Sequence, residues 1–167
     1  MTGHDPDQMR LVSARIRCRQ HVAALQEAQD DLANSPLGGL LSRLSREKIE
    51  CLNRMERRLL DQFAYRYTRL QDDMGARLLP AILQLLGEDV ASMSVIDRLN
   101  RLEQINWLPS AQEWQQLRYT RNAFTHDYPE TAEERWQSLQ QALSASQRLV
   151  QIFTALEQKI DQRWGVS

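Results

Sequence analysis

The stretch LNRMERRLLDQFAYRYTRLQDDMGARL, residues 52–78, has the strongest periodic pattern in the chain. Its apolar side chains recur every three or four residues, which is the spacing of one buried face of an α-helix. They are Leu52, Met55, Leu59, Phe63, Tyr67, Leu70, Met74 and Leu78. The pattern predicts a long helix that begins near residue 46, with Asn53 as a candidate interruption. Pro80 crowds the carbonyl of Ala76, so we expect a kink there, and Gly87 is expected to end the helix.

Amphipathic helices are also predicted on both sides of this stretch. The predicted ranges are 7–33, 95–104, 111–128 and 132–164. Capping-box patterns mark the starts of the last three, at Ser94–Asp97, Ser110–Glu113 and Thr131–Glu134. In the short helix 95–104, the side chains expected to be buried are Ile96, Leu99 and Leu102. The expected fold is therefore all-α, a single-domain antiparallel bundle of about five helices over residues 1–167.

Composition narrows the class of protein. A length of 167 residues suits one domain, and a formal net charge of -1 argues against an overall basic nucleic-acid binder, so any RNA contact requires a local patch. Cys18 and Cys51 lack metal-ligand spacing and are interpreted as reduced cysteines. The polar start is unlike a signal peptide, and the apolar run 78–86 is too short to span a bilayer. We therefore expect a soluble, cytoplasmic protein without a metal or cofactor and without a membrane partner.

A polar segment, RNAFTHDYP at residues 121–129, lies at the end of the helix predicted from residue 111. The stripe of that helix is Trp114, Leu117, Arg121, Phe124 and Tyr128, so Arg121 occupies a position that should be apolar. A buried arginine needs a partner for its donors or a phosphate. Asn122 and His126 lie one turn apart on the adjoining face, with Arg118 one turn before Asn122.

Arg121 and His126 are about 140° apart on a regular helix. One chain therefore cannot easily direct both groups at a single atom. Either the helix end unwinds near Thr125, or two copies of the chain meet along this face.

Asp72 and Asp73 are adjacent carboxylates in the long predicted helix. Neighbouring side chains on a helix diverge by about 100°, so the two cannot directly share one metal ion. Asp73 is at ion-pair spacing from Arg69 and from Arg77. A supporting contribution of either acid to the polar segment remains open.

The pattern Arg-x4-His-x-Tyr, at Arg121, His126 and Tyr128, resembles the signature of HEPN-domain proteins, in particular the HepT-like toxins that pair with a small nucleotidyltransferase. The Leu-Gln-Asp-x-Met-Gly run at 70–75 adds to the resemblance, which covers most of residues 46–164. It implies a metal-independent endoribonuclease that acts as a homodimer, with two motifs facing each other across a cleft.

The resemblance also implies roles for the motif residues. Arg121 would stabilise the phosphate charge, His126 would transfer protons, and Asn122 would orient His126 or the phosphate. Tyr128 would be the candidate acceptor of an adenylyl group from a nucleotidyltransferase antitoxin. The alternative is a non-catalytic helical subunit that presents this polar face to a nucleotidyltransferase.

Overall fold

The computed structural model describes residues 5–34, 49–126 and 131–165, and the described chain is all-α, as predicted. The helices are α1 (Pro6–Ala33), α4 (Arg54–Asp73), the π-helical turn η1 (Met74–Leu78), α5 (Leu79–Leu85), the 3-10 turn η2 (Val90–Ser92), α6 (Val95–Gln104), α7 (Ala111–His126) and α8 (Ala132–Trp164). Residues 34–39, where the sequence NSPLGG predicts a loop, fall almost wholly outside the described residues. None of the helices in these ranges is long and apolar enough to cross a bilayer.

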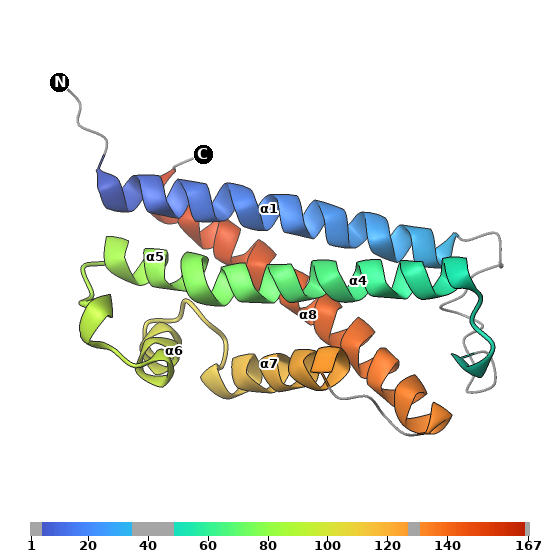
Figure 1. Cartoon of the computed structure of the whole chain (residues 1–167). Coiled ribbons are helices and arrows are strands. Elements are labelled where there is room, and N and C mark those ends of the chain that lie inside the picture. The colour runs from blue at the N-terminus through green and yellow to red at the C-terminus, as the bar shows by residue number, and fades with distance from the viewer. Residues whose placement is uncertain (1–4, 35–48, 127–130, 166–167) are drawn as a thin grey trace.

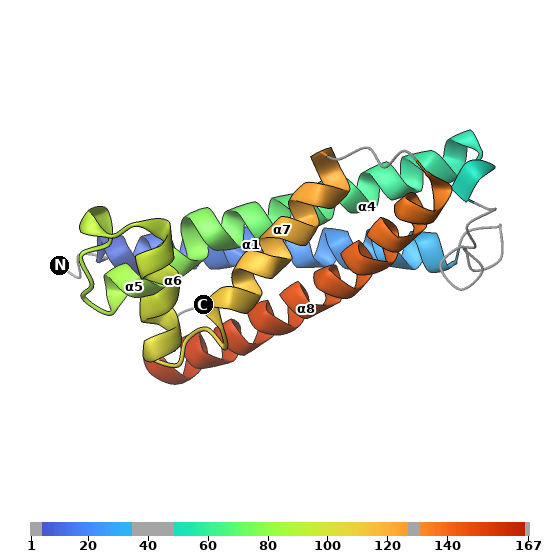
Figure 2. The ribbon, with the colours of Figure 1, turned by 90° about the horizontal axis from the view of Figure 1, so that it is seen from below.

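The helices pack as a bundle around one apolar core. Figure 1 shows α1 running antiparallel to a continuous rod made of α4, η1 and α5, with α8 crossing the bundle obliquely. Figure 2 shows α7 lying across α4 and α8, and α6 packs against α5 and α7. The largest buried apolar side chains include Leu11, Leu25, Phe63, Tyr67, Leu70, Ile82, Leu149 and Phe153. The motif helix α7 is thus held by its sequence neighbours α6 and α8 and by α4, which is distant in sequence.

The rod departs from the prediction at its start. Helix α4 begins at Arg54, not near residue 46, because Asn53 caps it: the Asn53 side chain accepts the N–H of Glu56, and the Glu56 carboxylate accepts the N–H of Asn53. Residues 46–48 lie outside the described part of the chain. Met55 was predicted to be buried but is exposed. It lies twelve residues before Tyr67, in three steps of four, and so points about 120° away from Tyr67 around the helix axis. Glu56 lies only about 20° from Tyr67 and is buried in its place.

The disturbance predicted around Pro80 takes the form of a π-helical turn. The N–H of Leu79 donates to the carbonyl of Met74, five residues back, and α5 then begins with Pro80 in its first turn. The wider turn accommodates a residue that has no N–H to donate. Gly87, with φ of 88°, follows the end of α5 as predicted, since this left-handed conformation suits glycine.

The other predicted helix starts are confirmed. Helix α6 begins at Val95 after a Ser94–Asp97 capping box, and α8 begins at Ala132 after Thr131–Glu134. Leu99 and Leu102 are buried as predicted. Ile96 was predicted to be buried and is exposed. It lies six residues before Leu102, in two steps of three, and so points about 120° away from Leu102 around the helix axis.

Candidate functional site

Arg121 forms an ion pair with Asp72 of α4, which supplies the partner that its position in an apolar stripe requires. Its Nη2 donates to Oδ1 of Asp72 at 2.6 Å. The Arg121 side chain is 12% exposed and that of Asp72 is 41% exposed, so the pair lies at the boundary of the core. The Arg121 Nε is buried and has no hydrogen-bond partner within the described ranges. This buried N–H donor of the guanidinium is therefore unpaired within these ranges.

Aromatic contacts hold α7 against α4 on either side of this pair. Phe124 packs edge-on against Phe63, with ring centroids 5.9 Å apart. The buried Tyr67 hydroxyl donates to the carbonyl of Leu117 at 3.4 Å, and burial raises the pKa of Tyr67 well above its ordinary value. The phenol therefore stays neutral and acts as a donor that positions the helix.

Helix α7 remains regular through His126, its last residue. The Thr125 hydroxyl donates to the carbonyl of Arg121, four residues back, at 2.9 Å. The alternative in which the helix unwinds near Thr125 is therefore not observed. Asn122 is half-buried and His126 is exposed, and no hydrogen bond between described residues joins either side chain to Arg121. Tyr128 lies outside the described residues.

The two adjacent acids of α4 contact different helices. Asp73 faces α1, where its Oδ2 lies 2.6 Å from Nε2 of His21. It also pairs with Arg77 at 3.3 Å and Arg69 at 3.9 Å, as the spacing predicted. Of the two candidate supporting acids, Asp72 is the one that contacts a motif side chain within the described ranges. Sequence reasoning had not assigned a partner to His21.

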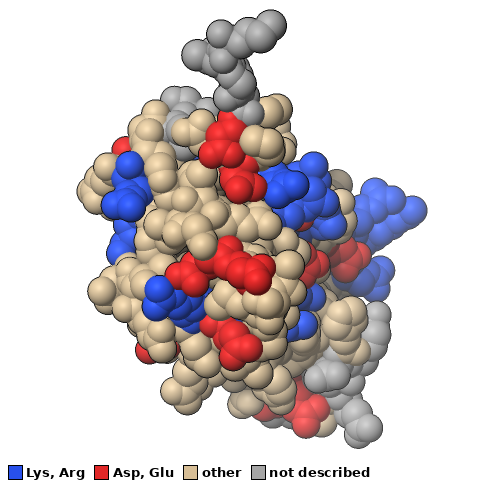
Figure 3. Space-filling model, turned by 90° about the vertical axis from the view of Figure 1, so that its left-hand side faces the viewer, with Lys and Arg blue, Asp and Glu red and all other residues tan. Residues whose placement is uncertain are grey.

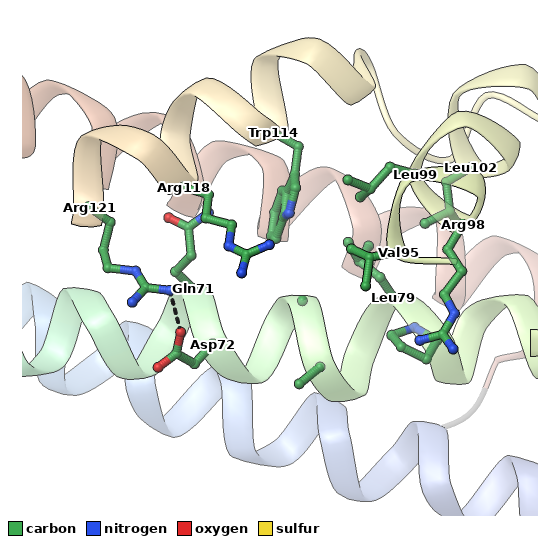
Figure 4. Close-up of a pocket in the computed structure, with 13 residues that line it drawn as sticks. Gln71, Asp72, Leu79, Val95, Arg98, Leu99, Leu102, Trp114, Arg118 and Arg121 are labelled. Atoms are coloured by element: carbon green, nitrogen blue, oxygen red, sulfur yellow. Dashed lines mark hydrogen bonds and ion pairs between the residues drawn. The ribbon is translucent and has the colours of Figure 1, made fainter. Parts of the chain in front are cut away.

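A cavity of about 280 Å³ adjoins Arg121 between α4–η1–α5, α6 and α7. Figure 4 shows Trp114, Arg118 and Arg121 descending from α7, Gln71 and Asp72 on α4, and Leu99 and Arg98 on α6. Its charged lining consists of Arg98, Arg118, Arg121 and Asp72, so positive charge is in excess. Arg118, another candidate residue of α7, therefore lies at the same pocket as Arg121. We call this cavity the arginine pocket.

Sequence reasoning missed Gln71 and Arg98. A signal for Gln71 exists, since it is one turn after Tyr67 on the buried face of α4, where an amide is unusual. Arg98 had no such signal, because only the packing of α6 against α5 brings it to the pocket, where its side chain descends from α6 towards α5 in Figure 4.

The positive charge around the arginine pocket is local. On the end of the molecule seen in Figure 3, basic and acidic side chains are interspersed among uncharged ones. A net charge of -1 agrees with this mixed surface. No group of three or more His, Cys, Asp and Glu side chains placed to hold a metal ion occurs among the residues that the structure describes.

Comparisons with known proteins add no assignment: no family model, no curated protein and no solved structure matches this chain.

Proposed function

We propose that this protein is a metal-independent endoribonuclease, the toxin of a type II toxin-antitoxin pair. The observation that carries the proposal is the placement of Arg121. Its guanidinium is oriented by Asp72 at the edge of a cationic pocket and keeps a donor without a partner in the described part of the chain, while His126 is exposed at the end of the same helix. A fixed guanidinium can stabilise phosphate charge and an exposed imidazole can transfer protons, which are two of the tasks in phosphodiester cleavage.

The reaction is an attack of the RNA 2′-hydroxyl on the adjacent phosphorus. A base removes the 2′-hydroxyl proton, the new O–P bond forms, and the bond to the 5′-oxygen breaks as an acid protonates that oxygen. His126 suits proton transfer near neutral pH. Arg121 suits the charge that develops on the phosphorane, and Asn122 would orient the phosphate or the imidazole.

Two chains are needed in this mechanism. The regular helix keeps Arg121 and His126 about 140° apart, which supports a cleft between two α7 helices in a homodimer. Each protomer then contributes one His126, so the base and the acid come from different chains. Sedimentation at micromolar concentration should show a dimer, and a monomer alone would contradict the cleft.

Cleavage by purified variants tests the catalytic roles. Arg121→Ala and His126→Ala should each lose cleavage by about 100-fold or more while keeping the circular dichroism spectrum of the wild type. Arg163→Ala, an exposed arginine at the far end of α8, is the control and should cleave normally. Wild-type rates in His126→Ala would rule out the proton-transfer role.

The proposed partner is a nucleotidyltransferase antitoxin, which neutralises the toxin by occlusion or by adenylylation of Tyr128. AMP on that phenol would place negative charge near the cleft and repel RNA. Intact mass after incubation with the cognate nucleotidyltransferase and ATP should show an adduct on the wild type and none on Tyr128→Phe. Absence of an adduct on the wild type would leave occlusion of the cleft by the antitoxin as the mode of neutralisation.

One observation favours a second function, a non-catalytic helical subunit that binds a nucleotidyltransferase. Asp72 already occupies one side of the Arg121 guanidinium, as expected for a structural arginine. Expression of the chain alone distinguishes the two functions. Growth arrest that His126→Ala relieves supports the ribonuclease, and unimpaired growth supports the binding subunit.

A further inference from the structure

We propose that the arginine pocket binds an adenine nucleotide, with the base held edge-on by Gln71 and the phosphate by Arg118 and Arg121. The pocket would accept either a free mononucleotide or one residue of an RNA strand. Only the second source rests on the proposed function, for which it would supply a base-reading subsite beside the motif.

The amide of Gln71 is the first support. Its side chain is 2% exposed, yet neither its Nε2 nor its Oε1 has a hydrogen-bond partner among the described residues. Figure 4 shows it rising from α4 into the space between Arg118 and Arg121. Buried polar groups in folded proteins are nearly always paired. An unpaired donor and acceptor side by side match the N6 amino group and N7 of adenine, which an amide binds with two hydrogen bonds.

The apolar wall is the second support. Trp114 is almost fully buried, and it lines the pocket together with Leu99 and Leu102 of α6. Gly75 lies beside the indole, where a Cβ would make an ordinary van der Waals contact at 3.4 Å from Cζ2 of Trp114. A planar base packs well against aromatic and aliphatic surface of this kind, whereas a simple anion gains no binding energy from it.

The arginines are the third support. Arg118 has neither a hydrogen bond nor an ion pair to any described residue, and Nε of Arg121 is buried without a partner in the same ranges. Arg98 donates from Nη2 to the carbonyl of Val90 at 2.9 Å, while its Nε is also buried and unpaired within the described chain. Asp72 offsets part of this charge. The remaining donors are planar forks suited to phosphate.

Calorimetric titration of the full chain tests the inference. AMP should bind, while ribose 5-phosphate and inorganic phosphate, which lack the base, should bind at least about tenfold more weakly. Gln71→Leu should weaken AMP binding by about tenfold or more, and Arg118→Gln should weaken all phosphate ligands. Gln147→Leu on the exposed face of α8 is the matched control and should bind AMP as the wild type does.

Thermal unfolding separates a ligand-binding glutamine from a structural one. Replacing an unpaired buried amide with an apolar side chain should leave the melting temperature of Gln71→Leu unchanged or higher. A lower melting temperature together with weakened binding would show that Gln71 acts only in the fold and would overturn its role in recognition. Equal binding of AMP and inorganic phosphate would reduce the pocket to an anion site and overturn the inference.

Competition by an oligonucleotide distinguishes the two ligand sources, and an RNA cleavage assay distinguishes the two proposals. An oligoadenylate with 2′-deoxy sugars cannot be cleaved by 2′-hydroxyl attack, and it should compete with AMP if the pocket binds one residue of a strand. If AMP binds and the oligonucleotide does not compete, the pocket binds a free nucleotide. AMP binding that depends on Gln71, without any RNA cleavage, keeps this inference and rejects the ribonuclease. Cleavage that depends on His126, without AMP binding, supports the ribonuclease and rejects this inference.

Discussion

Arg121 on α7 and Asp72 on α4 form a 2.6 Å ion pair, although 49 residues separate them in the chain. Because the Asp72 side chain is 41% exposed, water screens the pair and its contribution to stability is small. Its consequence is geometric: one side of the guanidinium is fixed at the edge of the arginine pocket, and its buried Nε has no partner among the described residues. Asp72 is therefore a positioning residue in the proposed mechanism.

Asp72→Asn should lower kcat for RNA cleavage by about tenfold, because Arg121 loses the partner that orients it. KM for RNA should stay the same or fall, since a negative charge is removed beside the phosphate site. The melting temperature should barely change. Steady-state kinetics provide the measurement, and an unchanged kcat would show that Asp72 does not position Arg121.

Asp73→Asn is the matched substitution at the neighbouring residue, and it should lower the stability of the fold and leave catalysis unchanged. Asp73 is 7% exposed and accepts contacts from His21, Arg69 and Arg77, so the uncharged amide should reduce the free energy of unfolding by about 1–3 kcal/mol. Below the melting transition, cleavage should stay close to the wild-type rate. Urea unfolding and cleavage assays on the two variants would give the same profile if the acids were equivalent.

Acid should weaken the attachment of α7 to α8. Hydrogen bonds from Arg148 hold the pKa of Glu113 below its ordinary value of 4.5. A carboxylate with a lowered pKa stabilises the fold above its unfolded pKa, and this contribution disappears as the pH falls through the folded pKa. Both side chains are partly exposed, so Glu113→Gln should cost about 1 kcal/mol or less at pH 7. The difference in stability between the wild type and the variant should shrink as the pH falls through the folded pKa of Glu113, as measured by urea unfolding over a pH series.

The two cysteines should differ in reactivity. Cys18 is buried, and loss of water around the thiol raises the pKa of Cys18 to about 12, so almost no thiolate forms at pH 8. Cys51 is exposed. Iodoacetamide at pH 8 should add one group to the folded protein and two after denaturation, as measured by intact mass. Rapid double labelling of the folded chain would show that α1 opens readily.

RNA cleavage should persist in EDTA, because the proposed reaction uses the 2′-hydroxyl and protein side chains alone. The same reaction requires that substrates with a 2′-deoxy sugar on the 5′ side of the cut remain intact. Gel analysis of both substrates with and without EDTA checks this. Activity that EDTA abolishes, or cleavage of the deoxy substrate, would contradict the mechanism.

The sequence by itself determined the helices and most of their ends. Capping boxes at Ser94 and Thr131, the stop at Gly87 and the apolar repeats each depend on residues within a few positions of one another, so local rules suffice. The same rules showed that Arg121 needed a partner. They failed at Met55 and Ile96, where a repeat read by spacing alone drifts around the helix.

Only the tertiary structure decided which polar groups meet. Adjacent acids of α4 point about 100° apart, and the packing of α7 on one side and α1 on the other assigned Asp72 to Arg121 and Asp73 to His21. The arginine pocket likewise arises where α6 and α7 converge on the rod of α4, η1 and α5. Spacing along one helix gives the direction of each side chain about that helix, whereas its partner depends on how separate helices are rotated and placed by the packing of their apolar faces.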